Sequence, residues 1–374
     1  MVRVLIDATA IPADRGGVGR YLDGLVAALA GPAGARAEVS VVSKPGDHAF
    51  FTGLGVHGIA GPAALERRPM RLAWEQVGLP RLARRERVDV LHCPHYTQPA
   101  VVGVPTVVTI HDATFFTHPQ LHSPVKARFF RAATRFAAKR AAGLVVPSAA
   151  TRDELGRVAG VAAQRVTVAP HGVDQATFRE PSEGEVANLR KSLDLDGRPF
   201  VAFLGTVEPR KNVPNLIRGW AAAVADRPDP PALVIAGGPG WDDGVDAAIA
   251  SVPAGLVLRR PGYLPLDQLP ALLGGAEVVA YPSLGEGFGL PVAEAMACGA
   301  AVLTTRRLSL PEVGGDAVAY TEPDADSITR ALRDLLDDPG RRDKLRAAAL
   351  DRAAEFTWER SARLHVEAYE GAAR

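Results

Sequence analysis

Two carboxylates, Glu286 and Glu294, stand eight residues apart in the segment EGFGLPVAEAMACG and are the first candidates for chemistry. Glu286 lies in a Gly-rich turn, where a carboxylate suits sugar hydroxyls or a developing positive charge. Glu294 falls about two turns into a predicted helix and suits neutral hydroxyls, such as those of a ribose. Either residue alone also fits an ordinary solvated surface. The two together favour a binding site.

The residues around Glu286 predict a strand, a turn and a helix in that order. The apolar run Val278–Tyr281 is typical of a buried strand, and Val292 to Ala297 are mostly good helix formers. Pro291 is tolerated in a first helical turn, and Gly299 stands where the helix should end. The turn therefore lies where open α/β sheets bind ligands and where free backbone N–H groups favour a phosphate.

A pair of cations, Arg210-Lys211, follows the predicted strand Phe200–Leu204. Asn212 is expected to cap a helix that continues through Trp220, which puts the two cations just before a helix amino end. Adjacent cations beside free N–H groups suit a diphosphate. An exposed basic turn is the alternative interpretation.

A further glycine pair, Gly16-Gly17, is expected in a loop between the strand Val2–Ile6 and a helix over Tyr21–Ala30. Glycines there let the backbone approach a phosphate or a sugar, although the same residues also serve simple chain reversal. The order G-G-x-G differs from the dinucleotide-binding fingerprint.

His111 follows the predicted strand Thr106–Ile110. From that edge of a sheet a His side chain can donate a hydrogen bond to a ligand hydroxyl or take part in proton transfer. A His that caps a loop is the alternative.

The composition of the 374 residues, 47% hydrophobic and 23% charged, describes a globular chain with room for two domains. The first residues are too short an apolar run for a signal peptide, and no stretch approaches the roughly 18 apolar residues that a spanning helix needs. A cytoplasmic location is therefore expected. Cys93 and Cys298 are far apart and are expected to be free, buried thiols.

A metal site is not expected from this sequence. The nine His and two Cys residues show no zinc-like spacing. Of two D-x-D sequences, Asp194-Leu-Asp196 falls in a polar connecting segment and Asp324-Ala-Asp326 fits a helix cap better than a metal-diphosphate site.

Charge is distributed unevenly along the chain. Residues 1–179 hold 22 Lys and Arg against 13 Asp and Glu, whereas the remainder holds 21 against 29. The segment Lys126–Arg140 contains six of these cations and no acid, and three Phe residues give it an apolar side. A basic half can face an anionic membrane or an acidic acceptor, although a solvated helix face and mutual docking of the two halves are also open.

Further apolar runs alternate with helical segments in two series, which predicts parallel, doubly wound sheets. The expected strands besides those above are Val39–Val42, Val88–Leu91, Leu144–Val146, Val166–Val168, Leu233–Ala236, Val257–Arg260, Ala301–Thr305 and Val318–Tyr320. A last helix from Phe356, with Thr357 as its cap, needs a surface to pack on.

Together these segments resemble the retaining family 4 glycosyltransferases (glycosyltransferase group 1, mannosyltransferase-like). The resemblance covers nearly the whole chain through IDA, RGGVGRY, VTIHD, VVPSAATRDEL, VAPHGVD, FLGTVEPRKN, YPSLGEGFGLPVAEAMACG, SLPEVGGDA and FTWER. It implies an α/β fold of the GT-B type, in which two Rossmann-like domains face each other across a cleft. The implied parts are an acceptor-binding domain (1–179), a linker (180–198), a nucleotide-sugar-binding domain (199–355) and a terminal helix on the first domain (356–374).

The resemblance also implies roles for single residues. Glu286 would hold the hydroxyls of the donor sugar and face the reacting carbon, and Glu294 would bind the ribose. His111 would touch the sugar near its 6-hydroxyl, and backbone at Tyr263 and Leu264 would meet the nucleobase. The residues implied in catalysis are Glu286, His111, Arg210 and Lys211. The residues implied in donor binding are Gly16, Gly17, Gly205, Arg210, Lys211, Tyr263, Leu264, Glu286, Gly287, Phe288, Gly289, Leu290 and Glu294.

The implied activity is retaining transfer of a hexose from a nucleotide-sugar to a saccharide or lipid-linked acceptor, without a metal or cofactor and without a nucleic-acid partner. Same-face attack, with the leaving phosphate taking the acceptor's proton, would explain why no base and nucleophile pair is found. Similarity of IDA, GVGRY and HSPVK to mannosyltransferase-like members favours GDP-mannose. Donors with UDP or dTDP that carry glucose, galactose or a deoxysugar are alternatives.

Two other classes are less favoured by the sequence. A sugar-nucleotide epimerase shares the architecture, but the glutamate pair with the HD sequence favours a retaining transferase. A binding protein without catalysis would be expected to lack one of the two carboxylates or the Arg-Lys pair, and this chain has all four. The basic first domain suggests peripheral contact with an anionic membrane at the inner face.

Overall fold

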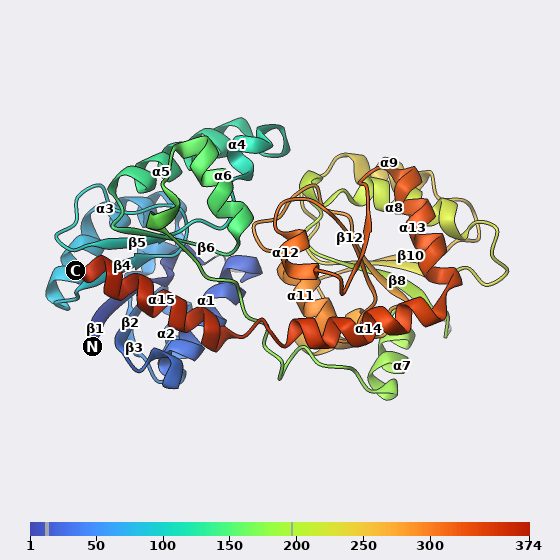
Figure 1. The fold of residues 1–374 in the computed structure, drawn as a ribbon, viewed down its shortest axis with the longest axis horizontal. Helices are drawn as coiled ribbons and strands as arrows, with labels where there is room; N and C mark the ends of the chain where they lie inside the picture. The colour runs from blue at the N-terminus through green and yellow to red at the C-terminus, as the bar shows by residue number, and fades with distance from the viewer. Residues whose placement is uncertain (12–14, 196) are drawn as a thin grey trace. The chain divides into compact units, whose positions relative to one another are not determined.

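A computed structural model describes residues 1–11, 15–195 and 197–374. The chain forms two compact units, residues 1–172 with 357–374, and residues 173–356. In each unit helices pack around one parallel sheet (Figure 1). The prediction of two Rossmann-like, doubly wound sheets is confirmed.

The first unit has a seven-stranded sheet in the order β3-β2-β1-β4-β5-β6-β7. Its strands are rich in Val, Leu and Ile and are largely buried, as expected of a parallel sheet covered on both faces. The strands are β1 (Val2–Asp7), β2 (Ala37–Ser43), β3 (His57–Ala60), β4 (Val90–Cys93), β5 (Thr106–Thr109), β6 (Gly143–Val146) and β7 (Val166–Val168). The helices are α1 (Gly16–Ala30), α2 (Pro45–Gly53), α3 (Arg68–Arg85), α4 (Thr114–Thr117), α5 (Pro124–Arg140), α6 (Ala149–Ala159) and α15 (Trp358–Ala373).

The second unit has a six-stranded sheet in the order β10-β9-β8-β11-β12-β13. The strands are β8 (Phe200–Leu204), β9 (Ala232–Ala236), β10 (Leu258–Gly262), β11 (Val278–Tyr281), β12 (Val302–Thr305) and β13 (Ala319–Thr321). The helices are α7 (Glu183–Ser192), α8 (Val213–Val224), α9 (Gly244–Ala250), α10 (Leu269–Gly274), α11 (Leu290–Ala297), α12 (Leu310–Gly314), α13 (Ala325–Asp337) and α14 (Pro339–Ala353).

Most strands expected from apolar runs are present, with ends displaced by one or two residues. Strand β3 was not expected, because its four residues, HGIA, offer little apolar signal and lie at the edge of the sheet. Asp324 caps α13 by accepting a hydrogen bond from Ser327 N at 2.8 Å, as predicted. Asp196 lies outside the described residues.

The chain passes between the units earlier than the sequence suggested. The boundary falls after Gly172, and the segment expected to be a linker, 180–198, belongs to the second unit. Its helix α7 begins with a capping box between Ser182 and Glu185, and Leu189 and Leu193 are buried in the core of that unit. Because these leucines are buried in the core, the segment is part of the second unit. Its polar composition had favoured a linker instead.

The terminal helix α15 belongs to the first unit. Thr357 caps it by accepting a hydrogen bond from Arg360 N at 3.2 Å, as predicted. Trp358 packs directly on Gly24, where a Cβ atom would lie 2.1 Å from the indole ring. Only glycine at this position of α1 allows the indole to dock.

The strand order places the ligand-binding edge of the second unit. Successive strands are added on one side of β8 and then, from β11 onward, on its other side, so the loops that follow β8 and β11, 205–212 and 282–289, emerge side by side. Such a reversal is the usual ligand site of open α/β sheets. The predicted cations and Glu286 lie on these two loops.

The structure also bears on the cysteines, on membrane-spanning helices and on metal-binding groups. Cys93 and Cys298 are free and buried, as predicted. In the described parts of the chain, no helix has the length and apolar character needed to cross a membrane. No group of three or more His, Cys, Asp or Glu residues is arranged to hold a metal ion within those same residues.

Candidate functional site

The loops that follow β8 and β11 are joined by direct hydrogen bonds. Leu284 N donates to Arg210 O at 2.8 Å, and Ser283 Oγ lies 3.1 Å from the same oxygen. In return, Arg210 Nη1 donates to Gly285 O at 2.6 Å. These contacts hold the predicted cation pair against the Gly-rich turn, although the two segments are about 75 residues apart in sequence.

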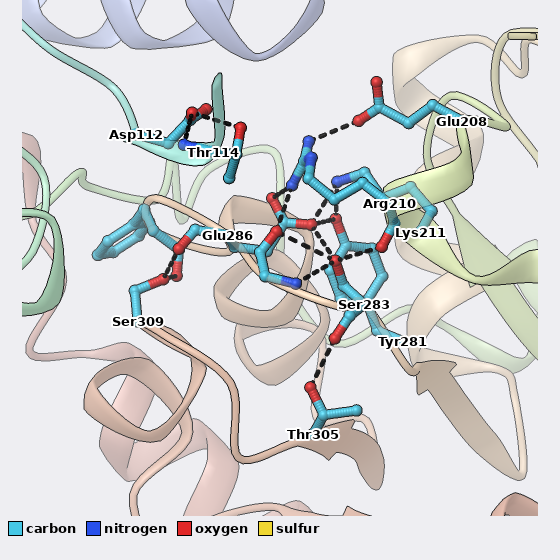
Figure 2. A network of polar contacts seen from close by, with 12 residues as sticks. Asp112, Thr114, Glu208, Arg210, Lys211, Tyr281, Ser283, Glu286, Thr305 and Ser309 are labelled. Atoms are coloured by element: carbon cyan, nitrogen blue, oxygen red, sulfur yellow. Dashed lines mark hydrogen bonds and ion pairs between the residues drawn. The ribbon is translucent and has the colours of Figure 1, made fainter. Parts of the chain in front are cut away.

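The Glu286 carboxylate lies at the centre of a dense polar network (Figure 2). Its Oε1 atom accepts hydrogen bonds from Lys211 Nζ at 2.7 Å, Ser283 Oγ at 2.7 Å and Tyr281 OH at 3.0 Å. Its Oε2 atom forms an ion pair with Arg210. Glu286 and Lys211 are only 7% and 8% exposed. The structure therefore brings together three of the four residues predicted for catalysis, and pairs them with one another.

The environment fixes the charge of these groups. Burial alone would raise the pKa of Glu286, but the charges of Arg210 and Lys211 outweigh it and lower the pKa to about 2. Burial lowers the pKa of Lys211, an effect that the Glu286 charge opposes. Burial also raises the pKa of Tyr281 well above its ordinary value, and the Glu286 charge adds to this. At neutral pH the site contains an ionised carboxylate and a neutral phenol.

The turn after Glu286 leads into α11 through Gly289, whose φ of 102° favours glycine. The Ser309 hydroxyl lies 2.8 Å from the carbonyl oxygens of both Glu286 and Phe288, which fixes this turn. The backbone of Gly287 to Leu290 thus stands at the amino end of a helix, where N–H groups favour an anion. Ser309, Tyr281 and Ser283 are site residues that were not predicted, although their motifs, SLPEV and YPS, could have signalled them.

Glu294 lies inside α11 and is 1% exposed. The alternative of an ordinary solvated surface residue is therefore wrong. A buried carboxylate needs polar partners.

The remaining residues predicted in the second unit lie at the ends of neighbouring strands. Gly205 follows β8, and Gly237 packs so closely on it that a Cβ atom would come within 2.2 Å of Gly205 O. Tyr263 follows β10 and is 59% exposed, with its hydroxyl 2.9 Å from the position of a Cβ atom on Gly238. Leu264 packs against the core of the unit.

The cap of α8 differs from its prediction. Asn212 is the residue before the helix, but it has φ of 61° and makes no side-chain cap. Its amide nitrogen donates instead to Pro282 O and Pro323 O. Asn212 therefore ties the cation loop to the loop after β11 rather than closing the helix end.

In the first unit, Gly16 and Gly17 are not in a loop, as was expected, but form the first turn of α1. Arg15, with φ of 51°, precedes the helix and forms ion pairs with Asp23 and Asp47. A Cβ atom on Gly17 would meet none of the described residues (1–11, 15–195 and 197–374) within 4 Å. Among those residues nothing blocks a close approach to the backbone here.

His111 lies just after β5, with its Nε2 atom 2.8 Å from Pro94 O. A carbonyl oxygen only accepts, so Nε2 carries the proton and Nδ1 is an acceptor. Burial lowers the pKa of His111, although the bond to Pro94 opposes this. In this arrangement His111 would meet a ligand hydroxyl through its acceptor nitrogen Nδ1. Its role at a ligand hydroxyl or in proton transfer stays a prediction.

The predicted residues thus form two groups. Arg210, Lys211, Glu286 and Glu294 belong to the second unit, and Gly16, Gly17 and His111 belong to the first.

Comparison with known proteins identifies matches to both halves of the chain. Residues 15–177 match the Glycosyltransferase Family 4 family, and residues 185–352 match the Glycosyl transferases group 1 family. O-antigen chain mannosyltransferase B of Escherichia coli is 30% identical over 80% of this chain and 77% of its own. MMP alpha-(1->4)-mannosyltransferase of Mycolicibacterium hassiacum is 30% identical over 77% of this chain and 72% of its own.

A solved structure extends the likeness to the fold. HepE of Anabaena, in complex with UDP-glucose, superposes with a TM-score of 0.75 over 98% of both chains at 17% identity.

Proposed function

Because this chain belongs to the group 1 glycosyltransferases, with a family 4 N-terminal half, it is a hexosyltransferase, and we propose that it transfers mannose from GDP-mannose with retention of configuration. The observation that carries the proposal is the cluster of Arg210, Lys211 and Glu286 at the point where the strand order of the second sheet reverses. The printed names of the two relatives, both mannosyltransferases, support the choice of mannose.

In the proposed reaction the second unit stabilises the leaving diphosphate. As the bond from the anomeric carbon to the phosphate oxygen breaks, negative charge grows on the diphosphate, and Arg210 and Lys211 neutralise it without a metal ion. The N–H groups at the start of α11 add to this stabilisation. Glu286 binds hydroxyls of the hexose, and Glu294 binds the ribose.

The acceptor oxygen attacks from the face that the diphosphate leaves, and the leaving phosphate oxygen takes the acceptor's proton. This route retains the configuration and needs no separate general base. In the first unit His111, through Nδ1, accepts a hydrogen bond from a hydroxyl of the donor sugar. Gly16 and Gly17 let the backbone approach the donor, and backbone at Tyr263 and Leu264 meets the nucleobase.

The first unit is proposed to bind a saccharide or lipid-linked acceptor at the cytoplasmic face of a membrane. On α5 the exposed side chains include Val125, at 81%, and Phe129, at 42%, and no acid lies on this helix. The exposed cations of α5 are Lys126, Arg128, Arg135, Lys139 and Arg140. Cations around exposed apolar side chains suit an anionic bilayer surface.

A UDP- or dTDP-sugar donor is the second candidate, because the nucleobase is proposed to meet backbone rather than a base-specific side chain. A thermal-shift panel of GDP-, UDP- and dTDP-sugars separates these donors, since the preferred donor should raise the unfolding temperature most.

Transfer itself is tested with the labelled preferred donor and a panel of saccharide and lipid-linked acceptors. The anomeric coupling constant of the product reports whether configuration is retained. Stabilisation by a donor without incorporation of hexose into any acceptor would count against a transferase, and an inverted product would count against the proposed mechanism.

A further inference from the structure

The cluster around Glu286 is electrically balanced. Arg210 forms ion pairs with both Glu208 and Glu286, and Lys211 forms one with Glu286. Two cations and two carboxylates sum to zero, so a diphosphate that approaches this arrangement meets no net positive charge from the four side chains. Tight binding of a diphosphate requires at least one carboxylate to give up its cations.

The Glu286 carboxylate holds the two cations as a phosphate group would. One oxygen receives Lys211 Nζ and the other receives Arg210, which is the two-oxygen pattern that a phosphate also offers. Lys211 Nζ contacts Glu286 Oε1 and the Tyr281 hydroxyl, and Lys211 is only 8% exposed, so its ammonium group has little room for a third partner. Contact of these cations with Glu286 and contact with a diphosphate therefore largely exclude each other.

We infer that Glu286 and the diphosphate compete for Arg210 and Lys211, and that this competition favours release of the nucleoside diphosphate after transfer. The inference rests on the proposed function, in which the diphosphate is the leaving group of this site. It gives Glu286 a role besides holding the sugar.

The donor sugar explains why substrate binds despite the competition. Hexose hydroxyls can donate hydrogen bonds to Glu286 and so replace the cations that the carboxylate gives up. Ser283 and Tyr281 continue to donate to the same carboxylate from short range. Once the hexose has moved to the acceptor, the nucleoside diphosphate offers no such hydroxyls, and Glu286 recovers Lys211 and Arg210. No covalent step is added.

A purely structural ion pair predicts a different outcome. If Glu286 only fixes the two cations in place, removal of its charge should leave diphosphate binding unchanged or weaken it, because the cations lose their support. If Glu286 competes, the same change should tighten binding.

The experiment is titration calorimetry of inorganic pyrophosphate, GDP and UDP with wild type and Glu286→Gln, which keeps the size of the side chain. Glu277→Gln is the matched control, because Glu277 pairs with Arg342 at 2.8 Å in the same unit and is not part of this cluster. We expect Glu286→Gln to bind pyrophosphate about tenfold more tightly than wild type and Glu277→Gln to match wild type. Equal or weaker binding by a folded Glu286→Gln protein would overturn the inference.

A second measurement needs only the wild type and covers the case in which Glu286→Gln does not fold. The nucleotide-sugar that binds best should bind several-fold more tightly than its own nucleoside diphosphate. A nucleoside diphosphate that binds as tightly as its sugar derivative would overturn the inference. The pyrophosphate comparison requires no transfer, so the two proposals can fail separately. If wild type transfers hexose but Glu286→Gln does not bind pyrophosphate more tightly, the proposed function stands and the inferred competition is wrong.

Discussion

The Nε2 atom of His111 donates a hydrogen bond to the carbonyl oxygen of Pro94 at 2.8 Å, and this contact leaves Nδ1 as the only ring atom for a ligand hydroxyl. Because burial lowers the pKa of His111, the ring stays neutral above pH 6.5 and remains an acceptor.

Replacement of His111 by Ala should lower kcat about tenfold, the cost of one hydrogen bond, with little change in the unfolding temperature. Wild-type kcat should show no decline caused by His111 between pH 6.5 and 8. His57→Ala, at an exposed position of the same unit, is the control. A fall in wild-type activity near pH 6.5 that disappears in His111→Ala would show that the ring titrates in this range.

Glu294 should recognise the ribose rather than the diphosphate, since it is buried in α11 and is proposed to bind neutral hydroxyls. Glu294→Gln should weaken the binding of GDP or UDP about tenfold while leaving pyrophosphate affinity unchanged. Calorimetry with the three ligands measures both effects. Loss of pyrophosphate affinity together with nucleotide affinity would indicate a general disturbance of the site.

Transfer should persist in EDTA, because Arg210 and Lys211 are proposed to carry the positive charge that the leaving diphosphate needs. Lys211→Ala should in turn lower kcat/KM about a hundredfold, because it removes a buried charge that is proposed to stabilise the leaving diphosphate and that also pairs with Glu286. Initial rates measured with and without an excess of EDTA test this. Activity lost in EDTA and restored by manganese would contradict metal independence.

The exposed cations of α5 should bind the protein to anionic vesicles. Wild type should sediment with phosphatidylglycerol vesicles but not with phosphatidylcholine vesicles, and less so at high salt. Reversal of Arg128 and Arg135 to Glu should weaken this binding more than tenfold, at about 1 kcal/mol for each cation lost near the surface.

Reversal of Arg84 and Arg85 is the matched control for the vesicle experiment, because it changes the net charge equally at exposed positions on α3. Equal loss of binding in both double variants would assign the effect to net charge and not to α5.

The sequence was most informative where the signals are local. The strand Val278–Tyr281, the Gly-rich turn and the helix that ends before Gly299 were all predicted, because apolar runs, helix formers and glycines mark them within a few residues. The cation pair after β8 was recognised for the same reason. The fold class followed from repeated alternation of such segments.

The contacts that define the site are long-range and could not be predicted. Lys211 pairs with Glu286, which lies 75 residues later in the sequence. Ser309, which fixes the Glu286 turn, lies a further 23 residues along the chain. Arg15, which precedes α1, pairs with Asp47, 32 residues further on. The inclusion of α7 in the second unit depends on burial of Leu189, which a polar sequence does not reveal.

A continuous series of hydrogen bonds joins α15 to the first sheet, with both of its ends on α15. Its five side chains are buried and come from α15, β4, β5 and α1; in order, they are Tyr369, His92, Thr109, Tyr21 and His365. His365 Nδ1 lies 2.8 Å from Ser361 O, so it donates there and Nε2 accepts from Tyr21. It follows that the Thr109 hydroxyl donates to the Tyr21 oxygen and that His92 Nε2 donates to Thr109. The Tyr369 hydroxyl then donates to His92 Nδ1.

This series of hydrogen bonds requires His92 and His365 to be neutral. Protonation of these residues at low pH should therefore weaken the packing of α15 on the first sheet. Burial lowers the pKa of His365 to about 4, against an ordinary 6.5, and lowers the pKa of His92 well below that value. Above pH 6.5 neither the folded nor the unfolded state binds the proton. As the pH falls from 6.5 to 4, these histidines bind protons in the unfolded state but remain neutral in the folded state. The unfolding free energy therefore decreases, and His365 accounts for about 3 kcal/mol of this decrease at pH 4.

Urea unfolding followed by fluorescence of Trp358 and the other tryptophans should therefore show a falling midpoint between pH 6.5 and 4. His365→Gln should be less stable than wild type at pH 7.5, by about 1–3 kcal/mol for the broken chain, yet lose less stability on acidification because one titrating group is gone. His57→Gln, at an exposed position, should retain the wild-type pH dependence. If His365→Gln loses as much stability between pH 6.5 and 4 as wild type, then His365 does not couple the docking of α15 to pH, and the slope belongs to other buried groups.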